Sequence, residues 1–297
     1  MKKIVIVNLA GGLGNQIFLF EAARFIASIN NGKILINKTG IDKYHSNGKS
    51  TIEDFVLPKD IKFFKFCSWI NKIYIRFQVL LEKFNNHNQS LSLILDEKYQ
   101  SFESNRIYRM VFQKNPKLII ITGFWQNFSH WHSNLDYKLK SEGKKFIELS
   151  KEIDSGLSIL FHYRLGKINN SWEHGWGALS PEFLLNALIT LGSKNPNLKN
   201  IWIFSNDLPE AKILTGSINY SPYKLFYIDD SELSPAELII LFSRSKILIC
   251  SNSTFSIIAA KIGKVKHVLV PSELSKNGHS NFELPTEWRK VKSVWLD

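Results

Sequence analysis

The second part of the chain alternates short apolar runs with helical patterns, and this alternation constrains the fold more than any other feature. The apolar runs predict strands at Leu157–His162, Ile201–Ser205, Lys224–Ile228, Lys246–Cys250 and His267–Val270. Helical patterns lie between them, at about residues 180–194, 207–214, 233–243 and 253–262. Strands that alternate with helices predict an α/β fold, in which helices cover both faces of a parallel sheet.

The chain opens with a strand, a glycine-rich turn and a helix. Lys3–Asn8 predicts a buried strand, Gly11, Gly12 and Gly14 follow it, and Ile17–Ala27 predicts a helix. A glycine turn between a strand and a helix can direct backbone N–H groups toward an anion. The turn therefore indicates a phosphate-bearing ligand, although a purely structural tight turn has the same residues.

A nicotinamide-dependent oxidoreductase is an alternative that these residues disfavour. The dinucleotide fingerprint needs a third glycine where this chain has Ile17, and an acidic residue about 20 positions later. The next predicted strand, Lys33–Ile36, is followed by Asn37.

The length of 297 residues fits two domains, and a hydrophobic content of 44% supports packed cores. A further buried strand is predicted at Lys117–Thr122, and the polar stretch 134–154 predicts a helix and a linker. We place the boundary within 145–156. We therefore expect two Rossmann-like α/β domains, 1–150 and 151–297, that face each other across a cleft.

The formal net charge of +12 favours anionic partners such as nucleotide phosphates or a membrane surface. The chain has no dense basic tract and no recognisable nucleic-acid module, so we expect no nucleic-acid partner. The segment 62–84 mixes Lys and Arg with aromatic and aliphatic residues, as an interfacial helix does. The alternative is a helix that packs on the core and keeps its lysines in water.

The sequence also predicts a cytoplasmic location. Cys67 and Cys250 lie far apart and fit no metal or redox spacing, which suits a reducing compartment. The apolar run after Met1 is too short for a secretory signal, and no run reaches the about 18 apolar residues of a membrane span. Any contact with the inner face of a membrane would be peripheral and made through 62–84.

Polar residues follow the predicted strands of the second part, where ligands of parallel sheets bind. Arg164 comes after the first strand and can bind phosphate with its guanidinium fork, while His162 also fits a structural histidine. Asp207 follows the second strand and can accept from a base edge such as that of guanine, or cap the next helix. Ser253 and Thr254 suit a diphosphate at a helix N-terminus, or a simple cap.

These segments together resemble the α-1,2-fucosyltransferases of glycosyltransferase family 11. The matching stretches, in the family's order, are Gly11–Phe18, Gly123–Gln126, His162–Gly166, Phe204–Asp207 and Ser251–Ser256. The resemblance implies the GT-B architecture, with an N-terminal domain that mainly binds the acceptor and a C-terminal domain that binds a GDP-sugar. It implies inverting transfer of L-fucose from GDP-β-L-fucose to the 2-hydroxyl of a galactose-type acceptor, without a metal or other cofactor.

Carried over residue by residue, the resemblance implies that Arg164 holds the donor β-phosphate and stabilises GDP as it leaves. His162 and Gly166 would shape the loop around Arg164. Asp207 would read guanine, and Ser253 and Thr254 would bind the diphosphate. Asn15 would be a catalytic contact that reaches across the cleft. Trp125, Gln126 and His174 would line the cleft or the acceptor site.

The loop after Arg164 departs from the family pattern, because Lys167 stands where the family commonly has an acid. Glu173 and His174 are the nearby candidates for the role of that acid, and Glu173 is our first choice as general base; a surface loop without such a role is the alternative. The departure leaves open another donor, such as GDP-colitose, and also a non-catalytic nucleotide- or glycan-binding protein. We expect the acceptor to be an oligosaccharide, in lipid-linked form, of a bacterial surface polysaccharide such as O-antigen.

Overall fold

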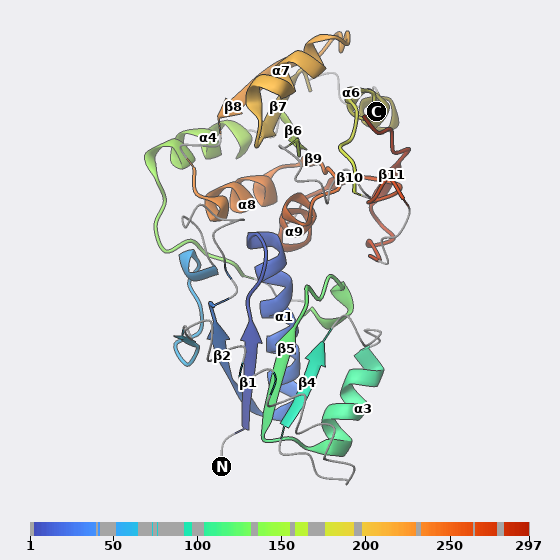
Figure 1. Ribbon diagram of the computed structural model, residues 1–297. Helices are drawn as coiled ribbons and strands as arrows, with labels where there is room; N and C mark the ends of the chain where they lie inside the picture. The colour runs from blue at the N-terminus through green and yellow to red at the C-terminus, as the bar shows by residue number, and fades with distance from the viewer. Residues whose placement is uncertain are drawn as a thin grey trace. The chain divides into compact units, whose positions relative to one another are not determined.

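The structure is a computed structural model. It describes residues 3–39, 41, 52–64, 73, 76, 92–96, 104–131, 136–154, 158–165, 176–192, 198–229, 233–263, 265–277 and 282–296. The chain divides into two compact units, Met1–Leu135 (unit 1) and Asp136–Asp297 (unit 2). Each unit holds a parallel sheet with helices packed against it, so the predicted α/β fold class is confirmed (Figure 1).

Among its described residues, unit 1 has a sheet of five parallel strands in the order β3-β2-β1-β5-β4. The strands are β1 (Lys3–Asn8), β2 (Gly32–Asn37), β3 (Lys62–Phe64), β4 (Ser92–Asp96) and β5 (Leu118–Thr122). The helices are α1 (Leu13–Asn30) and α3 (Ser104–Lys114), and short 3₁₀ turns lie at η1 (Ile52–Asp54) and η3 (Phe128–His130).

Helix α1 is the central helix of unit 1 and packs against β1, β2 and β5. It begins at Leu13, earlier than the predicted start at Ile17, because Gly12 already has the extended backbone of an N-cap. Most of its residues are buried, as expected for a helix that is apolar on nearly all sides. Its buried Glu21 pairs with Arg24, whose Nη1 lies 2.9 Å from Glu21 Oε1.

Unit 2 has, in its described part, a six-stranded parallel sheet in the order β11-β10-β9-β6-β7-β8. Its strands are β6 (Ser158–Tyr163), β7 (Asn200–Ser205), β8 (Lys224–Asp229), β9 (Ile247–Ile249), β10 (His267–Pro271) and β11 (Arg289–Val291). Its helices are α4 (Lys144–Asp154), α6 (Pro181–Leu191), α7 (Leu208–Gly216), α8 (Pro235–Arg244) and α9 (Thr254–Ile262).

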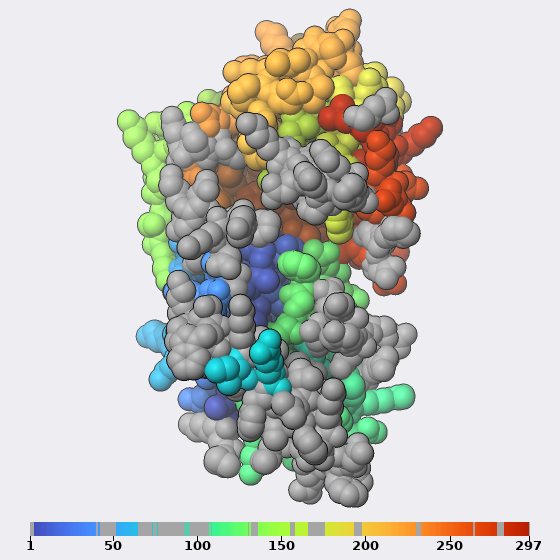
Figure 2. Space-filling view, viewed as in Figure 1, coloured from blue at the N-terminus to red at the C-terminus, as the bar shows by residue number. Residues whose placement is uncertain are grey.

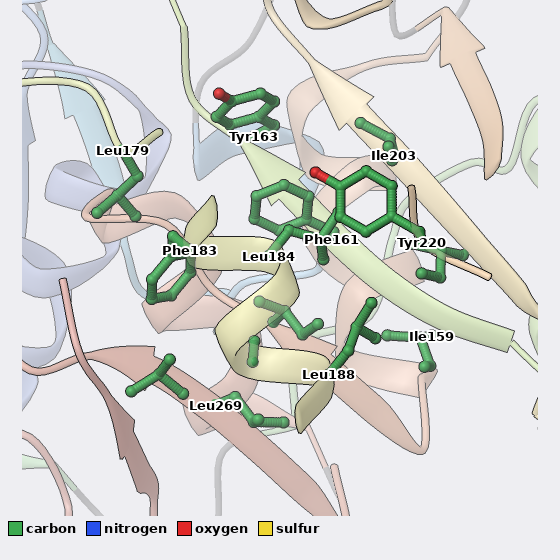
Figure 3. Close-up of a cluster of buried hydrophobic side chains, with 14 of the residues drawn as sticks. Ile159, Phe161, Tyr163, Leu179, Phe183, Leu184, Leu188, Ile203, Tyr220 and Leu269 are labelled. Atoms are coloured by element: carbon green, nitrogen blue, oxygen red, sulfur yellow. The ribbon is translucent and has the colours of Figure 1, made fainter. Parts of the chain in front are cut away.

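Helices cover both faces of the unit 2 sheet. Side chains of a strand point to opposite faces in turn, and in β6 Phe161 contacts Phe183 of α6 whereas His162 contacts Phe242 of α8. The α6 face carries a buried cluster in which Phe161, Tyr163 and Phe183 are prominent (Figure 3). Helix α7 forms part of the outer surface of the unit (Figure 2).

The division between the units falls at Leu135/Asp136, before the predicted interval 145–156. Helix α4 belongs to unit 2 because it packs on α8. The backbone N–H of Gly143 donates to Glu237 Oε1 at 2.7 Å, and the guanidinium of Arg244 lies 5.1 Å from the ring centroid of buried Phe146. These contacts attach α4 and the residues just before it to unit 2. The sequence of this polar stretch does not reveal them, so the predicted boundary lay too late in the chain.

The first residues of the segment 62–84 form a strand, which corrects the helix predicted there. Strand β3 pairs with β2 in parallel register, with Leu35 opposite Lys62. The adjacent phenylalanines favour a strand that can pair with a sheet edge. Of the rest, Ile73 and Arg76 are helical and exposed, and the other residues lie outside those described. No helix among the described residues is long and apolar enough to span a membrane.

Candidate functional site

The strand order of unit 2 creates a switch point beside β6. The chain runs from β6 through β7 to β8 on one side, and then returns to place β9 on the other side of β6. The loops after β6 and β9 therefore leave the carboxyl edge of the sheet in opposite directions. Such a switch point is where open α/β sheets bind ligands.

The polar strand ends predicted from the sequence lie next to one another at this edge. Strand β6 sits between β7 and β9, with His162 opposite Phe204 and Phe161 opposite Ile249. Arg164, Asp207 and Ser253 consequently follow three consecutive strands of one sheet. The prediction that these segments share a sheet edge is confirmed, and the structure adds their order along it.

His162 is buried and joins the ends of β6 and β9. Its Nδ1 lies 3.3 Å from Ser251 Oγ, and its ring contacts Phe242 and Phe255. Burial, followed by the positive charge of Arg164, lowers the pKa of His162 to about 3. The imidazole is therefore neutral near pH 7 and acts as a structural link between two loops of the candidate site.

Arg164 directly follows β6 and is half-buried. The next residue, Leu165, is buried, and its N–H donates to the carbonyl of Tyr163 at 3.0 Å, so the chain turns tightly there. Arg164 therefore lies at the carboxyl edge of the sheet, where β6 ends. The predicted site residues Gly166, Glu173 and His174, like Lys167, lie outside the described residues, and their roles stay predictions.

Asp207 caps helix α7, as the alternative interpretation of the sequence expected. Its Oδ1 accepts from the Glu210 N–H at 3.3 Å, and its own N–H donates to Ser205 Oγ at 3.1 Å. A carboxylate has several acceptor positions, so the cap leaves capacity for another donor. Recognition of guanine by Asp207 remains a prediction.

Ser253 caps helix α9, and Thr254 is the first residue of that helix. Ser253 Oγ accepts from the Phe255 N–H at 3.3 Å. The positive end of the α9 dipole thus lies at the same sheet edge as Arg164, a favourable place for an anion.

Asn252 is a buried loop residue for which the sequence alone predicts no role. It is 5% exposed, and its Nδ2 donates to the carbonyls of Trp176 and Gly177 at 3.2 and 3.0 Å. The N–H of Lys276 also donates to the Trp176 carbonyl. Asn252 therefore ties the loop after β9 to residues 176–177. In the sequence, Asn252 is a polar residue between two serines, and this pattern does not indicate that its side chain is buried.

Unit 1 has a corresponding switch point between β1 and β5. The glycine turn follows β1 there, and Gly11 has a left-handed φ of 68°, so the turn needs glycine. Gln16 is fully buried, donates to the Gly11 carbonyl at 3.0 Å and accepts from the Ile52 N–H at 3.3 Å. Gln126 Nε2 donates to Asn15 Oδ1 at 3.0 Å, so these two predicted site residues are brought together.

The resemblance places Trp125 in the cleft or the acceptor site, but in the structure its side chain is buried. It is 1% exposed, and its Nε1–H donates to the Thr122 carbonyl at 2.7 Å. The indole is buried in unit 1, and the backbone at Trp125 has a left-handed φ of 52°. Trp125 therefore acts as an anchor of the turn after β5.

Among the described residues, no group of three or more His, Cys, Asp or Glu side chains is placed to hold a metal ion. Cys250 is buried, which raises the pKa of its thiol to about 12. The expectation that catalysis needs no metal or other cofactor stays a prediction.

No family model and no curated protein matches the sequence. Solved structures do match. A mutant of Arabidopsis thaliana FUT1 in complex with GDP gives a TM-score of 0.54 at 11% identity, covering 99% of this chain and 74% of that chain. The fucosyltransferase NodZ from Bradyrhizobium gives 0.52 at 14% identity, with 87% and 92% covered. NodZ α-1,6-fucosyltransferase soaked with GDP-fucose gives 0.55 at 13% identity, with 92% and 96% covered.

At these identities the comparisons establish the fold. The chain has the two parallel α/β units of the GT-B type, in common with fucosyltransferases of known structure. They do not single out family 11, which stays a prediction.

Proposed function

We propose that this protein is a glycosyltransferase that uses a GDP-linked 6-deoxy-L-sugar as donor. The observation that carries the proposal is the adjacency of three polar loops, after β7, β6 and β9, at the switch point of unit 2. Structures of similar fold have been solved with GDP and with GDP-fucose, which supports the choice of nucleotide.

The charges of the loops suit a nucleoside diphosphate. Arg164 supplies a permanent cation, and the N-terminus of α9 with Ser253 and Thr254 supplies N–H and hydroxyl donors. GDP gains negative charge as the sugar leaves, so groups fixed around its β-phosphate act where charge develops. Neutral His162, through Ser251, keeps the two phosphate-binding loops in register.

The finer details extend the proposal by resemblance to family 11. L-fucose would pass from GDP-β-L-fucose to the 2-hydroxyl of a galactose-type acceptor with inversion, and Glu173 would remove the hydroxyl proton. Asp207 would read guanine with its remaining acceptor positions, and Asn15 would contact the reacting groups. GDP-colitose is the alternative donor. The acceptor would be lipid-linked, within synthesis of a bacterial surface polysaccharide such as O-antigen.

Release of GDP tests the proposal. The protein is incubated with GDP-fucose or GDP-colitose and lactose, with and without EDTA, and GDP is measured by chromatography. We expect activity that persists in EDTA and that falls by at least about 100-fold in Arg164→Ala, because removal of one charge-stabilising group costs about that much. Arg164→Lys is the matched control, since it keeps the charge but loses the bidentate fork.

Each alternative function has its own signature in this experiment. Full activity of Arg164→Ala would refute the role of Arg164. Tight GDP binding without turnover of either donor would favour a nucleotide-binding protein, and calorimetric binding of NAD(H) would favour the oxidoreductase.

The proposed peripheral membrane contact through 62–84 needs a separate test. We expect the protein to float with liposomes that contain anionic lipids and to remain behind with neutral ones. A protein that stays in the soluble fraction with both would contradict the contact.

A further inference from the structure

The turn after β5 in unit 1 exposes a single aromatic ring. Phe124 is 44% exposed, and its neighbours Gly123 and Trp125 have left-handed φ angles of 94° and 52°. A residue other than glycine in this conformation is strained, and the conformation persists only when surrounding contacts impose it. The turn is therefore a specified structure rather than a relaxed loop.

The contacts of Trp125 impose that structure. Its buried indole donates to the Thr122 carbonyl at 2.7 Å, and its own carbonyl accepts from the Asn127 N–H at 2.8 Å. With Trp125 fixed on the inside, the preceding side chain is left on the surface. The exposed aromatic residue of this turn is therefore Phe124, whereas Trp125 is buried.

Phe124 lies beside the glycine turn that follows β1. A Cβ atom added to Gly11 would come within 3.3 Å of Phe124 Cε1 and within 2.6 Å of Asn15 Nδ2. Gln126 donates to Asn15 from its Nε2. The phenyl ring therefore lies close to the Asn15 amide, which is hydrogen-bonded to Gln126, at the switch point between β1 and β5.

The two amides have capacity left for a ligand. Their mutual hydrogen bond uses Asn15 Oδ1 and one Gln126 N–H. Among the described residues, Asn15 Nδ2 and Gln126 Oε1 have no hydrogen-bond partner, so the pair offers a donor group on one side and an acceptor on the other.

This combination suits a pyranose ring. A pyranose has an apolar face of C–H groups and a rim of hydroxyls that both donate and accept. The exposed face of an aromatic ring can cover the apolar face of the sugar, and adjacent amides can form hydrogen bonds with its hydroxyls. A phosphate, in contrast, would gain nothing from the phenyl ring.

We propose that Phe124, Asn15 and Gln126 bind a sugar ring of the acceptor, with Trp125 as the positioning residue that holds Phe124 outward. This inference rests on the proposed glycosyl transfer for its identification of the sugar as the acceptor. It assigns to Phe124 a role in acceptor affinity and none in donor binding.

Steady-state kinetics with GDP-fucose and lactose test the assignment. In Phe124→Ala we expect the KM for lactose to rise about tenfold, the equivalent of about 1.4 kcal/mol, while the KM for GDP-fucose and acceptor-independent GDP release stay unchanged. Phe124→Tyr should keep the wild-type KM because it retains the ring. Phe112→Ala is the matched control, since Phe112 is a 73% exposed phenylalanine of α3 in the same unit.

A binding measurement that needs no turnover separates this inference from the proposed function. Saturation-transfer NMR with methyl β-D-galactoside should show contact with the wild type and with Phe112→Ala, and lose it in Phe124→Ala. If that pattern appears without any GDP release, the sugar site stands and the proposed transfer fails.

The opposite pattern overturns the site. Transfer by the wild type with an unchanged lactose KM in Phe124→Ala, or no saturation transfer to the wild type, refutes binding by Phe124. Circular dichroism and GDP binding of each variant verify that it is folded.

Discussion

At the residue scale, two buried tyrosines of unit 2 differ in whether their hydroxyls are satisfied. Tyr220 donates to the Pro181 carbonyl at 2.9 Å. Tyr163 is fully buried, and its hydroxyl has no partner among the described residues (Figure 3). Burial raises the pKa of both phenols, so neither ionises in the folded protein near neutral pH.

We predict opposite effects of removing the two hydroxyls. Tyr163→Phe should leave the free energy of unfolding unchanged or raise it by about 1 kcal/mol, because it relieves an unpaired buried group. Tyr220→Phe should lower it by about 1 kcal/mol, because a hydrogen bond is lost and a carbonyl is left unpaired. Urea unfolding measures both, and a larger loss in Tyr163→Phe than in Tyr220→Phe would contradict the difference.

His162 gives stability a specific dependence on pH. Its pKa is about 3 in the folded protein and 6.5 when unperturbed, so below pH 6.5 the unfolded chain binds a proton that the folded protein does not. Its contribution is therefore fully present above pH 6.5 and is lost as the pH falls from 6.5 toward 3. The loss is at most about 1.4 kcal/mol per pH unit.

The variant His162→Gln isolates this contribution. The free energy of unfolding, measured in urea at pH 7 and pH 5, should fall less between the two values in the variant than in the wild type. An equal fall in both proteins would assign the pH dependence to other groups.

At the scale of elements, a glycine sets the close approach of α8 and α9. A Cβ on Gly263 would lie 2.2 Å from the Ser243 carbonyl oxygen, whereas one on Gly216, at the end of α7, meets nothing within 4 Å. We predict that Gly263→Ala destabilises unit 2 by about 1–3 kcal/mol through overpacking. Gly216→Ala should be neutral or stabilising by up to about 1 kcal/mol. Comparison of their thermal midpoints checks this, and equal midpoints would refute it.

Local pattern predicted most elements of unit 2, because each strand and helix there carries its own periodicity and caps. Helix α8, for example, lies within the predicted helical range 233–243 to one residue and begins with a Ser234–Glu237 capping box. The short strands β3 and β11 were not recognised as strands, and β4 and α3 were not predicted. A strand of three residues is defined mainly by its partner in the sheet, which a local pattern does not contain.

The residues of the candidate site were predictable from the sequence, but their arrangement in space was not. Arg164, Asp207 and Ser253 were identifiable because polar residues follow apolar strands, but the strand order that makes them neighbours depends on pairings between distant segments. The burial of Trp125 depends on its packing in unit 1 and on its hydrogen bond to the Thr122 carbonyl, which its sequence neighbours do not specify. The burial of Asn252 depends on its contact with residues 176–177, far away in the chain.

At the scale of the whole molecule, the proposed binding of GDP to unit 2 predicts a response that is localised to that unit. GDP at about 100 times its Kd adds about 2.7 kcal/mol to the stability of the unit that binds it. Amide exchange should therefore slow in unit 2, most at residues 162–165, 205–207 and 250–256. The strands β1, β2 and β5 of unit 1 should exchange as before. Exchange measured by mass spectrometry tests this, and equal protection of both units would place GDP elsewhere.

The pairing of β1 with β5 also has a consequence for biosynthesis. Ile4 pairs with Leu118, so the two strands at the centre of the unit 1 sheet come from distant parts of the chain. At about 5–20 residues per second, the ribosome needs roughly 5 to 20 s after β1 to deliver β5. During that interval one edge of an apolar strand has no partner in the nascent chain, and such an edge is prone to pair with other polypeptides. A chaperone that covers this edge until β5 emerges would therefore favour the yield of folded protein.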